Sequence, residues 1–495
     1  MIDQQIIDFI EIGIIQKEIA SIDRIYLTNL LAELIGKKEL KLDLKASSII
    51  QPRLTIMDQL VNYAIEQQVI SLVEREMLEA QIMDLITPMP SAINHEFQKK
   101  YQENPITATD YFYQISQNNN YIKTREIAKN DLFTVETKFG LLEITINLSK
   151  PEKDPKQIAL EKLTPAVDYP KCLLCIENEG YAGRVNHPAR TQHRIIRLEL
   201  NQEAWGFQYS PYAYYEEHCI FLAAEHRPMK IEAATFRKLF GLVQQFPHYF
   251  VGSNADLPIV GGSILSHDHY QGGRHIFGMA KALLISHFKL PDFPTVSAGI
   301  VKWPMSVIRL SGENQHELEL AAVYILEKWR GYSDNAVAIQ AVSADGTPHN
   351  TVTPIVRKNG IYFELDLVLR NNRTTADYPD GIFHPHKESQ HIKKENIGLI
   401  EVMGLAILPP RLKEELQVVR RYLLNQAEEV APYHQIWAAQ LKQAHSLITV
   451  DNVTRIIEEA VGMVFLKVLE DAGVFKQTEI GLAAFNRFIL ALKTK

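Results

Sequence analysis

Two histidines one residue apart, His267 and His269, are the side chains of this sequence best placed to do chemistry. They stand in the string DLPIVGGSILSHDHYQGG at residues 256–273. The apolar run IVGGSIL predicts a strand that leads into a short turn, with the His-x-His continuing in extended geometry. Because side chains alternate along a strand, both imidazoles and Gln271 would share one face. Two imidazoles backed by an amide suit reactions at a phosphorus atom, although a lone His-x-His is more often a pair of satisfied histidines.

The whole string at 256–273 resembles the active-site signature of the class II galactose-1-phosphate uridylyltransferases. More distantly, its HDHYQ segment is similar to the His-Pro-His-x-Gln of class I uridylyltransferases and of the histidine-triad superfamily to which they belong. Asp268 stands where class I has proline, so class II is the closer pattern. The likeness extends in general texture over 169–276 and 381–411.

This resemblance implies that His269 attacks the α-phosphorus of a nucleoside diphosphate sugar and carries UMP, which splits one transfer into two displacements. The attacking nitrogen must be unprotonated, and the histidine-triad pattern bonds the other ring nitrogen to a nearby backbone carbonyl. The side chain of Asp268 is expected on the opposite face of the strand. Gln271 can donate its amide to a non-bridging phosphoryl oxygen. We therefore expect His269 and Gln271 to be catalytic.

Cys172 and Cys175 have the two-residue spacing that lets two thiolates reach one metal ion. His226 and His267 are the best candidates for the two further ligands of a tetrahedral site. Class I enzymes hold a zinc with a Cys-x-x-Cys, a distant His and the first His of the His-x-His, in this same order. The resemblance thus implies a structural zinc. A thioredoxin-like redox pair lacks a βαβ context here, whereas a pair of thiols without metal stays an open alternative.

The loop at 177–194, ENEGYAGRVNHPARTQHR, is the best candidate for an anion pocket, since guanidinium groups bind phosphate oxygens in pairs. A solvated, turn-rich loop is the alternative interpretation. Glycines in and around the histidine string allow close backbone approach to a phosphate or ribose. The residues expected to bind substrate are Asn254, Asp256, Gly272, Gly273, Arg184, Asn186, Arg190 and Arg194.

Two groups later in the chain offer alternatives. One is a set of histidines near an acidic residue that loosely resembles the iron site of class I enzymes: His384, His386, His391 and Glu401. The other is a polar run that is a second candidate for holding the sugar phosphate: Arg370, Asn371, Asn372 and Arg373.

The elements that must position these residues have a mixed pattern. Residues 2–98 carry apolar side chains at three- and four-residue steps, which predicts helices. The runs LFTVETKFG and LLEITINLS predict a hairpin around 139–140. From 169 to 370, strand-like runs, AVAIQAVS among them, alternate with helical stretches, and three helical patterns follow 395 with breaks near Pro432 and Gly473. This order predicts an α+β fold with mainly antiparallel sheet.

The resemblance implies two histidine-triad-like halves with helical N- and C-terminal extensions. We expect a helical N-terminal extension with a hairpin at 1–165 and the first half, with the active site, at 166–300. The second half is expected at 301–425 and C-terminal helices at 426–495. The charged, proline-containing run at 149–162 predicts a linker or a surface excursion.

Composition excludes several classes of function. The formal net charge of -7 provides no basic field for nucleic acid and no cationic patch for a membrane. The first residues are apolar but interrupted by acids and lack a basic region, which predicts neither a signal peptide nor a membrane span. Three cysteines form no disulfide framework, so a reducing cytoplasm is expected.

The resemblance to class II enzymes implies the function of a cytoplasmic UDP-glucose–hexose-1-phosphate uridylyltransferase. UMP would pass from UDP-glucose to galactose 1-phosphate through a uridylyl-histidine in a ping-pong cycle. A histidine-triad nucleotide hydrolase or dinucleoside phosphorylase is the alternative enzyme, and a zinc-binding scaffold is the non-enzymatic alternative. A homodimer is an open expectation, because the sequence carries no signal for oligomeric state.

Overall fold

The computed structural model describes residues 2–41, 47, 50–149, 167–262, 264–427 and 429–493. The chain divides into two compact units, and each unit is assembled from three separate segments. The first unit comprises Met1–Arg125, Pro151–Ala213 and Cys219–His226. The second comprises Glu126–Lys150, Tyr214–His218 and Arg227–Lys495. Nearly all of the predicted linker at 149–162, and the predicted boundary after 165, lie outside the described residues.

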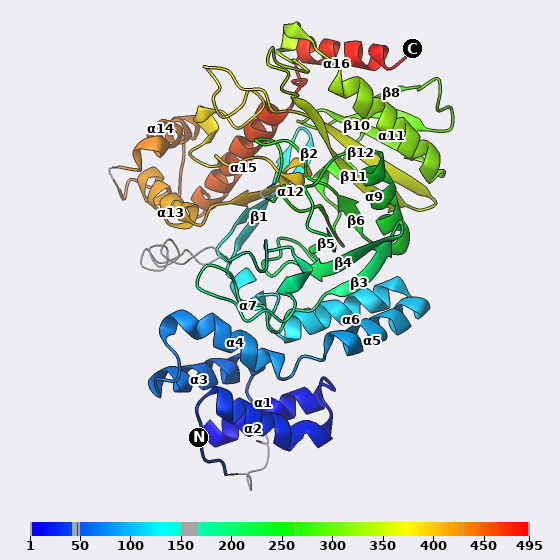
Figure 1. Ribbon diagram of the computed structural model, residues 1–495. Helices are drawn as coiled ribbons and strands as arrows, with labels where there is room; N and C mark the ends of the chain where they lie inside the picture. The colour runs from blue at the N-terminus through cyan, green and yellow to red at the C-terminus, as the bar shows by residue number, and fades with distance from the viewer. Residues whose placement is uncertain are drawn as a thin grey trace. The chain divides into compact units, whose positions relative to one another are not determined.

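The first unit begins with helices that pack around an apolar core of their own (Figure 1). The two helices that follow begin with Pro90 and Pro105. Proline is favoured at the first helical position, because the backbone N–H that it lacks would have no partner within the helix there. A turn follows the second of these helices, with Asn120 in a left-handed conformation (φ 57°). These helices are α1 (Ile2–Ile15), α2 (Arg24–Leu34), α3 (Arg53–Glu66), α4 (Arg75–Asp84), α5 (Pro90–Glu103) and α6 (Pro105–Asn118).

Three antiparallel strands complete the first unit: β3 (Ile196–Leu200), β4 (Glu203–Tyr209) and β5 (Cys219–Ala223). Asn94 of α5 ties that helix to the first strand. Its Nδ2 donates to Ile195 O at 3.0 Å, and its Oδ1 accepts from Arg197 N at 2.7 Å.

The second unit contains a run of antiparallel strands in the order β7-β6-β11-β12-β10-β9-β8. Helices α9 (Ala233–Gln245) and α11 (Gln315–Arg330) pack against this sheet (Figure 1). The strands are β6 (Phe250–Gly252), β7 (His269–Gly273), β8 (Leu284–Phe288), β9 (Ser297–Val301), β10 (Val307–Gly312), β11 (Asn350–Asn359) and β12 (Tyr362–Asn371).

A smaller sheet of the second unit joins distant parts of the chain. The predicted hairpin is confirmed as β1 (Asp131–Thr137) and β2 (Gly140–Ile146), and β13 (Leu405–Leu408) pairs with β2 in parallel. The C-terminal helices are α13 (Arg411–Leu423), α14 (Gln435–Ala444), α15 (Val453–Ala472) and α16 (Glu479–Ala491). The breaks predicted at Pro432 and Gly473 both separate helices. The described residues also contain the short helices α7 (Thr124–Ile127), α10 (Gly278–Lys281) and α12 (Leu399–Val402).

A charged cluster lies inside the larger sheet of the second unit. The fully buried Asp366 of β12 accepts from Arg309 Nε at 2.6 Å and from Arg357 Nη1 at 2.7 Å. Burial alone would raise the pKa of this carboxyl group, but the two guanidinium groups hold it below its usual value. Three adjacent strands are thereby joined by side chains as well as by their backbone ladders.

The prediction of an α+β fold with mainly antiparallel sheet is confirmed. The prediction that IVGGSIL forms a strand is wrong, because Ile259 has a left-handed φ of 73° and Gly261 packs too closely on its neighbours. A Cβ on Gly261 would lie 2.5 Å from Ala255 O, so residues 259–262 form a tight loop.

The strand predicted for AVAIQAVS is also wrong. Residues Asn335–Val337 form a 3-10 turn, and the Asp334 side chain caps it by accepting from Ala336 N at 3.1 Å. Ala338 then adopts a left-handed φ of 58°, which ends any extended run.

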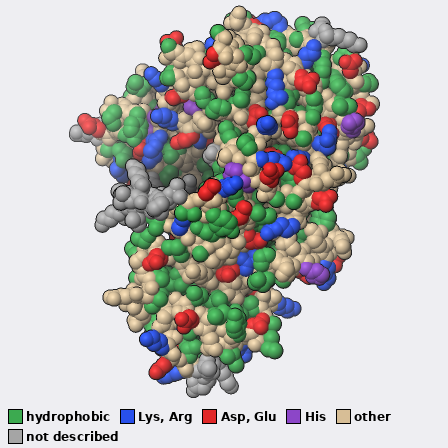
Figure 2. All heavy atoms as spheres, in the orientation of Figure 1, with side chains coloured by type: hydrophobic (Ala, Val, Ile, Leu, Met, Phe, Trp, Pro, Cys, Tyr) green, Lys and Arg blue, Asp and Glu red, His purple; other side chains and the backbone are tan. Residues whose placement is uncertain are grey.

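Figure 2 shows Lys and Arg side chains interspersed with Asp and Glu over the visible face of the molecule. This mixture of signs agrees with the modest net charge of -7. Among the described residues, no helix has both the length and the apolar character that a bilayer crossing requires.

Candidate active site

Strand β7 carries the histidine that the sequence marks as the nucleophile. The strand begins at His269, and its Gln271, Gly272 and Gly273 pair with β6. His267 lies before the strand, so only the second histidine is in the extended geometry that the sequence predicts for both. The two imidazoles therefore occupy different structural settings.

The His269 ring is held in a defined state. Its Nδ1 lies 2.7 Å from the backbone oxygen of His267, the kind of carbonyl acceptor that the histidine-triad pattern implies. Burial lowers the pKa of His269 to about 4, although the hydrogen bond to that carbonyl works in the opposite direction. With its proton donated from Nδ1, a neutral His269 keeps a lone pair on Nε2.

Asp268 is engaged away from this ring. Its Oδ2 accepts from Arg227 Nη2 at 3.2 Å and lies 3.8 Å from Lys238 Nζ on α9. Its backbone N donates to Arg227 O at 2.7 Å. The carboxylate therefore anchors the backbone between the two histidines, in agreement with the expectation that it faces away from His269.

Gln271 has a neighbour that no sequence motif marks. His218 Nε2 lies 3.1 Å from Gln271 Oε1, and the ring is only 4% exposed. Burial lowers the pKa of His218 to about 4, while the hydrogen bond to Gln271 raises it. The two residues lie far apart in sequence, so only the folded chain shows the pair.

The buried His218 predicts an acid-dependent loss of stability. Between about pH 6.5 and pH 4 the unfolded chain binds a proton at this ring and the folded chain does not, so acidification favours unfolding. Through this ring, the free energy of unfolding falls by up to about 1.4 kcal/mol for each pH unit of acidification in that window. Above the window the ring adds no pH dependence. In urea titrations across this range, the non-titrating variant His218→Gln should show the shallower pH dependence. Equal slopes for the two proteins would contradict the assignment.

The segment that carries His218 is fastened to β7. The buried Glu217 pairs with Arg274 Nε at 2.8 Å and also accepts from Tyr249 Oη. Tyr215 Oη donates to Gly272 O at 3.1 Å. A Cβ on Gly273, whose φ is 153°, would lie 2.8 Å from Glu217 O. Because Gly273 has no side chain, the segment that carries His218 can pack closely against it. The substrate contacts expected of Gly272 and Gly273 stay predictions.

Asn254 and Asp256 also hold the local fold. Asn254 Oδ1 accepts from Leu399 N at 2.9 Å, at the start of α12. The two carboxylate oxygens of Asp256 accept from Ile231 N at 2.9 Å and Thr351 Oγ1 at 2.6 Å. Their expected roles in substrate binding stay predictions.

The predicted metal ligands of the first unit lie together. Cys175 Sγ is 3.5 Å from Cys172 Sγ and 3.1 Å from His226 Nδ1, and the three ligand atoms lie within 4.8 Å of one another. Two sulfurs and an imidazole nitrogen are a donor set that zinc prefers. Burial raises the pKa of the Cys175 thiol to about 12, and a bound cation would reverse this preference by stabilising the thiolate. The fourth predicted ligand, His267, belongs to the second unit.

The arginines of the 177–194 loop differ in their contacts. Arg194 is 6% exposed and donates to Pro88 O and Asp84 Oδ1, which makes it a structural tie to the helical region. Arg184 donates to Asn186 Oδ1 at 2.7 Å and to Tyr169 O at 2.7 Å. The Arg190 guanidinium lies over the Tyr121 ring, with its central carbon 5.3 Å from the ring centroid.

Comparison with known proteins shows the family. The N-terminal domain of galactose-1-phosphate uridyl transferases matches residues 17–228, and the C-terminal domain matches residues 242–439. The chain belongs to the galactose-1-phosphate uridylyltransferase family. This confirms the resemblance drawn from the histidine string.

Similar members of the family match along nearly the whole chain. A galactose-1-phosphate uridylyltransferase of Enterococcus faecalis is 56% identical over 98% of this chain and 97% of its own. One from Streptococcus pneumoniae is 55% identical over 97% of both chains, and one from Ligilactobacillus salivarius is 55% identical over 99% of both. The solved structure of yeast Ap4A phosphorylase Apa2 matches 60% of this chain and 89% of its own, with 14% identity and a TM-score of 0.30.

The later histidines of this galactose-1-phosphate uridylyltransferase family member have separate partners. His384 Nε2 lies 3.1 Å from Asn396 Oδ1, and Glu401 is paired with Lys393 Nζ at 2.9 Å. His386 Nδ1 lies 3.5 Å from Asp471, whose charge is already balanced by Lys467. His384, His386 and Glu401 therefore each have a polar partner within the fold, while the ring of His391 packs against His434 and Trp437.

The polar run that begins at Arg370 is also engaged by the fold. Arg370 is 1% exposed and donates to Ile397 O at 2.8 Å. Asn371, equally buried, donates to Gln340 O at 3.0 Å. These hydrogen bonds stabilise the fold, and the two buried side chains expose little surface that a sugar phosphate could contact.

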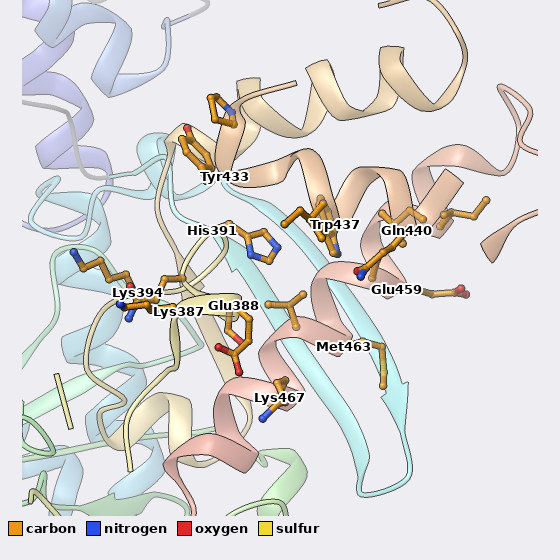
Figure 3. A pocket seen from close by; sticks show the side chains of 18 of the residues that line it. Lys387, Glu388, His391, Lys394, Tyr433, Trp437, Gln440, Glu459, Met463 and Lys467 are labelled. Atoms are coloured by element: carbon orange, nitrogen blue, oxygen red, sulfur yellow. The ribbon is translucent and has the colours of Figure 1, made fainter. Parts of the chain in front are cut away.

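A cavity of about 1290 Å³ lies among the C-terminal elements of the second unit (Figure 3). The rings of His391 and Trp437 meet there with their centroids 5.3 Å apart. Exposed Lys387 and Lys394 stand beside acidic residues such as Glu388 along its lining. His391, one of the histidines compared with the class I iron site, lies in its lining, whereas the residues proposed for catalysis, zinc binding and substrate binding do not, so the cavity has no part in the function proposed below.

Proposed function

We propose that this chain transfers UMP from UDP-glucose to galactose 1-phosphate through a uridylyl-histidine at His269. The observation that carries the proposal is the hydrogen bond from the His269 ring to the His267 carbonyl, within a member of this family. It supports a neutral ring whose Nε2 lone pair is available to attack. The names of the similar proteins support galactose 1-phosphate as the sugar phosphate.

The proposed reaction consists of two displacements at the α-phosphorus. In the first, His269 Nε2 forms a P–N bond as the P–O bond to glucose 1-phosphate breaks. In the second, a phosphate oxygen of galactose 1-phosphate attacks the same phosphorus, the P–N bond breaks and UDP-galactose leaves. The amide of Gln271 donates to a non-bridging oxygen on which charge accumulates in both transition states. Because this donor is neutral, it does not trap the uridylyl-enzyme.

The substrate-binding role remains proposed for all eight residues. Arg190 is the best supported among the arginines, because its guanidinium stacks on a ring while Arg184 and Arg194 donate to protein oxygens. The remaining members of the proposed set are Asn186, Asn254, Asp256, Gly272 and Gly273.

We also propose one structural zinc ion, held by Cys172, Cys175 and His226 with His267 as the fourth ligand. The close approach of the first three ligands supports it. When bound, the metal would fix the backbone immediately before His269. Because thiolate ligands require reduced cysteines, the proposal places the protein in a reducing compartment such as the cytoplasm.

Metal analysis tests the zinc. Protein purified without chelators should contain about one zinc per chain, and Cys175→Ser should lose most of it because a closed site needs all four ligands. The matched control is Cys219→Ala, which removes the remaining cysteine from β5 and should leave the zinc content unchanged. Zinc-free wild-type protein, or full zinc in Cys175→Ser, would exclude the site.

The uridylyl transfer is tested with UDP-glucose labelled in the α-phosphate. The protein should acquire acid-labile label in stoichiometric amounts, and galactose 1-phosphate should release that label as UDP-galactose. Release by water at the same rate would favour the hydrolase alternative. Absence of any label would argue for a non-enzymatic zinc-binding protein.

A further inference from the structure

A glutamine side chain is useful to the proposed reaction in only one of its two orientations. One end of the amide is an NH₂ donor and the other is an oxygen acceptor. Only the NH₂ end stabilises a phosphoryl oxygen that gains negative charge. The backbone of β7 sets the direction of the Gln271 side chain but not which end of the amide lies forward. A second group must determine that choice.

His218 is placed to determine it. Its Nε2 approaches the Oε1 end of the Gln271 amide at 3.1 Å. Its Nδ1 is buried and has no hydrogen-bond partner among the described residues. A proton on Nδ1 would therefore be a buried donor without an acceptor, which is the more costly arrangement. The proton belongs on Nε2, from which it is donated to Gln271 Oε1.

The surroundings of His218 keep the ring neutral and in place. Burial lowers its pKa to about 4, so the ring offers one proton and not two near neutral pH. The rings of Tyr215 and Tyr214 lie against it at centroid distances of 4.6 and 5.7 Å. The adjacent Glu217 is buried and bound by Arg274, which fixes the backbone next to the imidazole.

We infer that His218 is a positioning residue that locks the Gln271 amide with its NH₂ group directed toward the reacting phosphoryl group. The inference rests on the proposed function, since the amide matters only if Gln271 contacts the phosphoryl oxygen. His218 itself need not touch substrate. It acts on the rate of uridylylation through the hydrogen bond that it donates.

A double-mutant cycle measures how far the effect of His218 on the reaction depends on Gln271. The readout is the rate of single-turnover uridylylation by UDP-glucose. His218→Phe keeps a planar ring but removes the donor, and should slow the step by up to the roughly 10²–10³-fold expected for losing one oxyanion donor. In a Gln271→Ala background the same change should have almost no further effect, because no amide remains to be oriented. His218→Gln, which can donate from its own Nε2, should recover much of the wild-type rate. The KM for UDP-glucose should change much less than kcat.

A measurement on the unmodified protein guards against variants that fail to fold. The ¹⁵N shifts of labelled histidine report which ring nitrogen carries the proton, and His218→Gln assigns the signal. A proton on Nε2 is expected, whereas a proton on Nδ1 would overturn the inference. Multiplicative rate losses in the double mutant would also overturn it. If the wild-type protein forms no uridylyl-enzyme at all, the proposed function fails first, and the tautomer still reports on the hydrogen bond.

Discussion

Replacement of His269 by asparagine is expected to lower kcat/KM for uridylyl transfer by on the order of 10⁴-fold or more. The physical reason is that asparagine has no nitrogen lone pair that can form a phosphoramidate bond. The variant should acquire no acid-labile label from UDP-glucose. It should still bind UDP-glucose and keep a cooperative unfolding transition, because the substituted side chain can donate to the His267 carbonyl as the ring does.

Two comparisons identify the nucleophile within the His-x-His. His287→Asn alters an exposed histidine of β8 and should leave the rate within about twofold, as expected for a surface change remote from the chemistry. His267→Asn should still form the labelled intermediate, with the defect appearing in metal content and stability. Label retained in His269→Asn but lost in His267→Asn would reverse the assignment of the two histidines.

Removal of the carboxylate in Asp366→Ala is expected to reduce the free energy of unfolding by about 3–5 kcal/mol. The substitution leaves Arg309 in the sheet without a counter-ion, and leaves Arg357 with Glu364 as its remaining carboxylate partner. Both guanidinium groups are largely buried and cannot recover their lost partner from water. Urea unfolding followed by circular dichroism gives the change directly.

The matched control is an ion pair of the same charge type at the surface. Arg455 and Glu459 are four residues apart on α15, with side chains 67% and 51% exposed. Glu459→Gln should therefore change stability by less than about 0.5 kcal/mol. A second comparison replaces Arg309, Asp366 and Arg357 together by apolar residues, which should restore much of the stability lost in Asp366→Ala. A loss below about 1 kcal/mol in the single variant would contradict the buried-cluster interpretation.

The sequence predicts the residues proposed to take part in the reaction or bind metal more fully than it predicts the residues that hold them in place. His269, Gln271 and the Cys-x-x-Cys lie in short motifs, so their types and spacing are visible without a structure. His218 was missed because its partner is distant in sequence and the hydrogen bond depends on how the strands pair. The role of Arg194 in the fold was missed for the same reason, since its contact with Asp84 links remote segments.

The elements of the fold show a similar division. Helices with a clear apolar period and the hairpin at 131–146 could be predicted, because each pattern is local. The strand expected at IVGGSIL fails because an apolar run does not reveal that Gly261 must fit against the carbonyl of Ala255. Likewise, nothing local marks β13 as the parallel partner of β2.

The parallel pairing of β2 with β13 constrains the order of events during protein synthesis. Glu143 pairs with Leu405, so β2 leaves the ribosome long before its outer neighbour exists. At roughly 5–20 residues per second, this interval is on the order of tens of seconds. During this interval the outer edge of β2 has no strand to pair with. An unpaired strand edge can pair with other chains and therefore favours aggregation. Because the two compact units alternate along the chain, neither can be completed before the other has begun, and a single cut in the gene would release neither as an intact piece.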